Sequence, residues 1–163
     1  MLLIFATEGS THWLNLWAPG KHMILQCDFC TILSPKMFGE FFLPEIQEQC
    51  KAYEYPMYHL DGPEEIKHLD MLLDIPELKS IQWVPIPGKG DVREWMPLFK
   101  RIQKAGKSLY FAVSPWYGTS YKDIEYVLEE LSPKGLFIDT VCDTEEEAKW
   151  LMSKLDRWSC SRL

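Results

Sequence analysis

Short apolar runs alternate with amphipathic stretches along most of this chain. The apolar runs have the length and composition of buried strands, and the stretches between them carry apolar residues three or four positions apart, as one face of a helix requires. The predicted strands span residues 22–27, 57–60, 79–84, 108–113 and 135–141. The predicted helices span residues 34–50, 64–73, 91–106, 121–131 and 144–155.

Capping residues support the ends of these helices. Ser34 precedes a proline and is expected to cap the first helix, while Pro44 inside that helix is expected to kink it near Glu40. Thr144 and Glu147 have the spacing of a capping box at the start of the last helix.

Five strands, each followed by a helix, predict an α/β fold with a parallel sheet and helices outside it. Residues 1–163 are expected to form a single domain, with residues 1–21 as an irregular entry segment in which residues 7–21 are rich in Gly, Ser, Thr, Trp and Pro. Parallel sheets of this kind place functional groups at the carboxyl ends of the strands.

Charge and composition argue against two classes of partner, nucleic acids and membranes. The 163 residues are 47% hydrophobic and carry 17 basic against 24 acidic side chains, a formal charge of -7, with the basic residues scattered. A nucleic-acid partner is therefore not expected. The apolar opening is too short for a bilayer and lacks a basic flank, and five cysteines form an odd set. We expect a cytoplasmic protein with free or metal-bound thiols and no membrane association.

Side chains that could bind a metal ion or transfer a proton lie at the predicted strand ends. His59 and Asp61 are two residues apart in an extended strand and so point to one side. The alternative is that Asp61 only caps the next helix. With Cys27 and Cys142 from two other strand ends, this pair would form the four-ligand set that zinc prefers. The motif Cys27-x-x-Cys30 also resembles a redox pair, but such motifs open a helix directly and residues 31–34 intervene here.

Other strand-end side chains are candidates for a pocket that binds a small molecule. Tryptophans near this rim could wall such a pocket, or simply cover the sheet. The predicted substrate-binding residues are Trp17, Gln26, Asp28, Gln82 and Trp83.

Residues 28–46 (DFCTILSPKMFGEFFLPEI) resemble a segment of the uroporphyrinogen decarboxylase superfamily, and the likeness continues in order through residues 59–62 (HLDG), 81–85 (IQWVP) and 135–142. It covers roughly residues 9 to 156. The resemblance implies a (β/α)8 TIM barrel, of which the five strand-helix units would be the carboxyl-terminal (βα)5 portion. The amino-terminal half-barrel is expected to come from a partner, or copies of the chain to associate as a homo-oligomer.

The superfamily includes zinc-dependent methyltransferases that work with cobamide proteins. The resemblance implies zinc at His59 and Cys142, with Asp61 standing where those enzymes have a cysteine, and a cobamide carried by a partner protein. The asparagine-containing motif of the true decarboxylases is absent from residues 138–142. Three alternatives stay open: a decarboxylase-type lyase without metal, a non-catalytic fragment that serves association, and a glycosidase using Asp61 and Asp139 as paired carboxylates.

Overall fold

A computed structural model describes the fold of most of the chain. It covers residues 4–5, 9–14, 16–88 and 91–162. The chain divides into two compact units, residues 1–82 and residues 83–163. We call them the first and second unit and describe each by itself. The single domain expected from the sequence stays a prediction.

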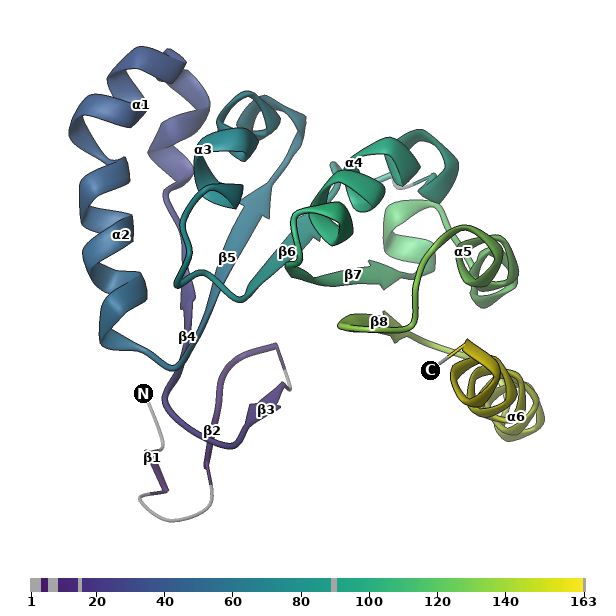
Figure 1. The fold of residues 1–163 in the computed structure, drawn as a ribbon. Coiled ribbons are helices and arrows are strands. Elements are labelled where there is room, and N and C mark those ends of the chain that lie inside the picture. Colours follow the sequence, from purple (N-terminus) through teal and green to yellow (C-terminus); the bar gives the residue numbers. More distant parts are fainter. Residues whose placement is uncertain (1–3, 6–8, 15, 89–90, 163) are drawn as a thin grey trace. The chain divides into compact units, whose positions relative to one another are not determined.

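The predicted parallel sheet is present. Its five strands follow one another in sequence order, β4-β5-β6-β7-β8, with β4 and β5 paired in parallel in the first unit and β7 and β8 in the second (Figure 1). The α/β class predicted from the sequence is therefore confirmed. Among the described strands the order ends at β4 and β8. The bounds are β4 His22–Leu25, β5 Tyr55–Asp61, β6 Ser80–Val84, β7 Ser108–Val113 and β8 Leu136–Thr140.

The entry segment, expected to be irregular, contains a small antiparallel sheet instead. Its strands are β1 (Ile4–Phe5), β2 (Gly9–Thr11) and β3 (Trp17–Ala18). Ser10 joins it to the parallel sheet, because its Oγ donates to the Gly20 carbonyl (2.6 Å) and accepts the His22 N–H (2.8 Å). Strands this short have too few residues for an alternating pattern, so the hydrophobic pattern could not reveal them.

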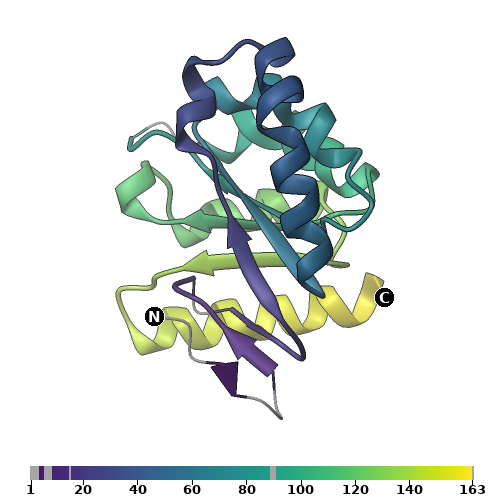
Figure 2. The same cartoon turned by 90° about the vertical axis from the view of Figure 1, so that its left-hand side faces the viewer.

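Helices α1 and α2 replace the single kinked helix that the sequence predicted. Ser34 caps α1 by accepting the Met37 N–H at 3.2 Å, as expected. The helix ends at Phe41, Phe42 caps it, and Pro44 stands in the first turn of a new helix, where its missing N–H costs nothing. Both helices lie over the same face of β4 and β5 (Figure 2). The first unit contains η1 Asp28–Ile32, α1 Pro35–Phe41, α2 Leu43–Ala52, η2 Pro63–His68 and α3 Leu69–Leu73, where η denotes a 3₁₀ helix.

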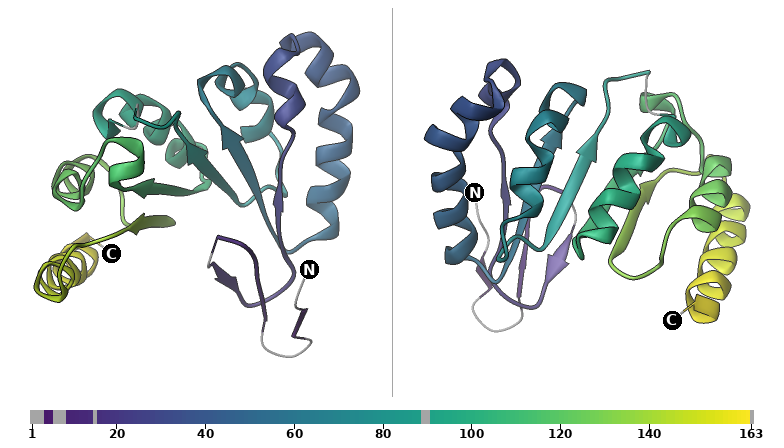
Figure 3. Two further views of the ribbon diagram at one scale, coloured as in Figure 1. Left: turned by 180° about the vertical axis from the view of Figure 1, so that it is seen from behind. Right: turned by 45° about the horizontal axis from the view of Figure 1, so that its top comes forward.

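In the second unit α4 precedes β7, the helices η3, η4 and α5 lie between β7 and β8, and α6 follows β8 (Figure 3). The Thr144–Glu147 capping box is confirmed: Thr144 Oγ1 accepts the Glu147 N–H at 3.2 Å, and Glu147 Oε2 accepts the Thr144 N–H at 3.1 Å. None of the helices in the described part of the chain has the length and apolarity needed to span a bilayer. The helices are α4 Val92–Lys104, η3 Pro115–Tyr117, η4 Tyr121–Asp123, α5 Ile124–Glu130 and α6 Glu145–Arg162.

Alternation along β5 separates the core from the candidate site. Tyr58 and Leu60 are fully buried, and they share one face of the strand because residues two apart point the same way. His59 and Asp61 therefore point to the other face, at the carboxyl end of β5. The core of the first unit thus fixes the direction in which the candidate site faces.

Candidate functional site

His59 is held in one orientation at the end of β5. Its Nδ1 lies 2.5 Å from Oε1 of Gln82 on β6. An amide oxygen only accepts hydrogen bonds, so Nδ1 carries the ring proton in the neutral imidazole and Nε2 keeps its lone pair. Nε2 lies 3.9 Å from Oδ2 of Asp61. The ring thus presents a free nitrogen beside a carboxylate, an arrangement that suits metal binding or proton transfer.

The capping alternative for Asp61 is wrong. The residue that precedes the next helix, η2, is Gly62, which has φ 87°, and no side chain accepts a capping hydrogen bond there. Asp61 is the last residue of β5 and its side chain is exposed. Its carboxylate is therefore available to a ligand together with His59.

Trp13 forms an aromatic wall beside His59. The two rings meet edge to face, with centroids 5.3 Å apart at 75°, although Trp13 is 54% exposed. Trp13 was not among the predicted site residues, because nothing local predicts that the entry segment reaches β5. Trp17, the tryptophan that was predicted to bind substrate, is 63% exposed on β3, and its ring covers Gly9 of β2.

Gln26, Cys27 and Asp28 directly follow β4, as predicted. Gln26 and Asp28 are exposed, and Cys27 is half-buried at the start of η1. Burial raises the pKa of the Cys27 thiol. Within the described part of the chain, no three His, Cys, Asp or Glu side chains form a group that could hold a metal ion. Of the four predicted zinc ligands, His59 and Asp61 are the pair whose contact the structure shows.

The remaining predicted residues lie in the second unit. Trp83 follows Gln82 on β6, so its side chain points to the opposite face, and it is only 2% exposed. It packs on Trp95 of α4 with centroids 4.7 Å apart, which is a core position. Cys142 follows β8 and is half-buried, and burial together with the nearby Glu147 carboxylate raises its pKa.

A buried polar cluster lies directly behind Asp61. Glu65 of η2 is 1% exposed, and its Oε2 accepts the Asp61 N–H at 3.2 Å. Burial raises the pKa of this carboxyl group to about 7. The carboxyl group also interacts with the Cys30 thiol, which lies 3.8 Å from the Tyr58 hydroxyl. Sequence reasoning missed Glu65, although its position four residues before Leu69 places it on the apolar side of the predicted helix.

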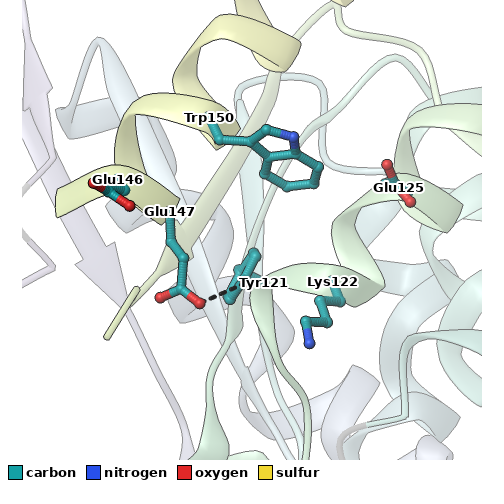
Figure 4. Close-up of a pocket in the computed structure, with 6 residues that line it drawn as sticks. All are labelled: Tyr121, Lys122, Glu125, Glu146, Glu147 and Trp150. Atoms are coloured by element: carbon teal, nitrogen blue, oxygen red, sulfur yellow. Dashed lines mark hydrogen bonds between the residues drawn. The ribbon is translucent and has the colours of Figure 1, made fainter. Parts of the chain in front are cut away.

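The second unit contains a cavity of about 520 Å³. Figure 4 shows Tyr121 and Glu147 joined across it, with the tyrosine hydroxyl donating to Glu147 Oε1 at 2.7 Å. That hydrogen bond lowers the pKa of Glu147, which also caps α6, and Glu125 is paired with Lys154. The Glu147 and Glu125 carboxylates therefore already take part in contacts that stabilise helices. The lining residues are Tyr121, Lys122, Glu125, Glu146, Glu147 and Trp150.

Comparison of the chain with known protein families, with curated proteins and with solved structures finds no match. The arrangement at His59 therefore has to be interpreted from its own chemistry.

Proposed function

We propose that the chain is the carboxyl-terminal half of a barrel enzyme similar to the zinc-dependent methyltransferases of the uroporphyrinogen decarboxylase superfamily, and that His59 binds the metal. One observation carries the proposal, the 2.5 Å contact between His59 Nδ1 and Gln82 Oε1. A histidine that ligates a metal through one ring nitrogen usually donates its other N–H to an oxygen acceptor. The Gln82 amide fills that supporting role from a neighbouring strand.

Asp61 supplies the second ligand in this proposal. Its Oδ2 lies on the same side as His59 Nε2, and the 3.9 Å between these atoms leaves room for both to turn to one ion. Zinc bonds to nitrogen and oxygen at roughly 2.0–2.2 Å, so two ligand atoms on one ion lie about 3 Å or more apart. Cys27, which follows the neighbouring strand β4 in the same unit, is proposed to add a thiolate ligand.

Bound zinc would lower the pKa of a thiol or polarise an oxygen of the substrate near neutral pH. The residues of this chain would orient the ligand: Gln82 holds the His59 ring, and the Trp13 ring excludes water from one side of it. Gln26 and Asp28 are exposed at the neighbouring strand end, where a small substrate could meet them. A cobamide, if used, would be delivered by a partner protein.

Zinc titration of the purified chain tests the proposal. We expect about one zinc per chain, strong loss of binding in His59→Ala, and about a 10- to 100-fold weaker affinity in Gln82→Leu, which keeps every ligand but removes the acceptor for Nδ1. Gln49→Leu on the exposed side of α2 is the matched control and should bind zinc like the parent chain. A parent chain that binds no zinc, or a Gln82→Leu variant of unchanged affinity, would contradict the proposal.

A metal-free decarboxylase-type site is the competing function. It is favoured by the Trp13 ring beside the His59–Asp61 pair, because an exposed aromatic wall suits a flat ligand. The same titration separates the two functions, since this alternative expects no zinc and no effect of Gln82→Leu on metal content.

A further inference from the structure

The Cys27-x-x-Cys30 motif has a geometry that the sequence did not predict. The motif was expected to lie apart from any helix, with residues 31–34 intervening. In the structure η1 begins at Asp28, immediately after Cys27, so that expectation is wrong. The Cys30 N–H donates to the Cys27 carbonyl at 2.8 Å, which closes one tight turn.

This turn brings the two thiols together. Cys27 itself precedes η1 and has an extended φ of -149°, so the turn fixes the separation of the two Cα atoms. The Cα atoms of such a turn are less than about 7 Å apart, and a disulfide needs about 4.4–6.8 Å. The Cys27 thiol interacts with the Cys30 thiol, and both cysteines are free.

The two cysteines differ in exposure, as the members of an exchanging pair do. Cys27 is half-buried and reachable, whereas Cys30 is fully buried. A buried free cysteine is usually packed as a small apolar residue. Cys30 instead faces the Tyr58 hydroxyl at 3.8 Å and the Glu65 carboxyl, whose Oε1 is buried without a well-formed hydrogen bond. Polar groups around a buried thiol indicate a site that does more than fill space.

We propose that Cys27 and Cys30 form a reversible dithiol–disulfide site that reacts with small-molecule disulfides. The Cys27 sulfur attacks one sulfur of the small disulfide, forming a mixed disulfide while the disulfide's own S–S bond breaks and one thiol leaves. The Cys30 sulfur then attacks the Cys27 sulfur, the mixed S–S bond breaks, and the second thiol leaves. Two electrons and two protons pass to the small disulfide, which becomes two thiols.

The order of attack follows from burial. An incoming disulfide can reach Cys27, and Cys30 can then resolve the intermediate because it lies one turn away. A variant without Cys30 should therefore stop at the mixed disulfide. A variant without Cys27 should react slowly or not at all, because the remaining sulfur is enclosed by the core.

The test is a redox titration of the full chain, treated with a chelator so that no metal protects a thiol. The protein is equilibrated with mixtures of reduced and oxidised glutathione, and its free thiols are then alkylated. The mass of the peptide that contains both cysteines is measured by mass spectrometry. We expect the parent chain to lose two hydrogens in that peptide and to regain them in excess thiol. Cys30→Ser should accumulate one glutathione on Cys27, and Cys27→Ser should leave Cys30 unmodified.

Cys160→Ser is the matched control, because Cys160 is exposed near the end of α6. It should behave like the parent chain in the Cys27–Cys30 peptide. If both thiols of the parent chain remain open to alkylation at every glutathione ratio, the proposal is overturned, and this measurement needs no variant to fold. Glutathione on Cys30 in Cys27→Ser at the rate seen for Cys27 would also overturn it.

Discussion

Glu65 is a carboxyl group enclosed at the end of β5. It is 1% exposed, and its one well-formed hydrogen bond from the described backbone comes from the Asp61 N–H. Burial raises its pKa from 4.5 to about 7, because the charged form loses its hydration. The Glu65 carboxyl group therefore titrates while it is hydrogen-bonded to the backbone of Asp61, a proposed metal ligand.

The raised pKa predicts how stability depends on pH. Between pH 4.5 and about 7 the folded chain keeps the Glu65 proton while the unfolded chain releases it. The folded state binds more protons there, so the free energy of unfolding falls as pH rises through this window. The loss reaches at most about 3 kcal/mol above pH 7, from 1.36 kcal/mol per pKa unit.

Glu65→Gln should remove that loss, because a neutral amide keeps an oxygen for the Asp61 N–H without carrying charge. Urea unfolding at pH 5 and pH 8 should show a smaller difference for this variant than for the parent chain. Glu64→Gln, at the exposed neighbouring position, is the control and should keep the parent's difference. An unchanged difference in Glu65→Gln would show that the carboxyl group titrates normally.

The candidate site shows which residue positions a sequence can reveal. His59 and Asp61 were predicted to share one side, since the two-residue period of a strand is a local rule. The role of Gln82 depends on which residues β5 and β6 bring opposite each other, and that alignment is not encoded within either strand. Trp13 reaches His59 from a segment 46 positions earlier, a distance that no local pattern spans.

At the scale of elements, strands with a continuous apolar composition were predicted most closely. The expected strand at residues 108–113 has the same bounds as β7. Helix ends were less predictable where a proline has two possible roles. Pro44 was expected to kink a continuing helix, but the helix is divided at Phe42, and Pro44 stands in the first turn of α2.

The entry to β8 depends on a glycine. Gly135 has φ 69°, and a Cβ there would lie 2.7 Å from the Ser108 hydroxyl, while its carbonyl accepts the Leu109 N–H that begins the β7–β8 pairing. Gly135→Ala should lower the free energy of unfolding by more than about 1 kcal/mol, the usual cost of the backbone strain alone.

Gly106→Ala is the matched control for this element. Gly106 has a similar φ of 75°, but no atom lies within 4 Å of the added Cβ. Thermal and urea unfolding should therefore show a smaller loss than for Gly135→Ala. Equal losses in the two variants would mean that the contact with Ser108 contributes nothing.

At the scale of the whole molecule, the open sheet predicts self-association. The described strand order ends at β4 and β8, so each has one edge whose backbone groups pair with no other described strand. Apolar side chains are exposed on the edge strand β8, as Phe137 is, and on the face of the sheet at β5, where Trp13 lies beside His59. Unpaired edges next to exposed apolar surface favour contact with another chain.

We therefore expect the isolated chain to form a homo-oligomer, most simply a two-fold dimer, through β8 or the exposed face of the sheet. Burying apolar surface stabilises such a contact by roughly 25 cal/mol per Å², so several hundred Å² give a strong drive to associate. Light scattering across a hundredfold dilution measures the mass of the associated species.

Phe137→Glu should weaken the dimer if β8 forms the interface, whereas Val141→Glu, just past the strand, should weaken it less. A chain that stays monomeric at every concentration and melts cooperatively would show that these edges are covered within one molecule, and the half-barrel proposal would fail with it.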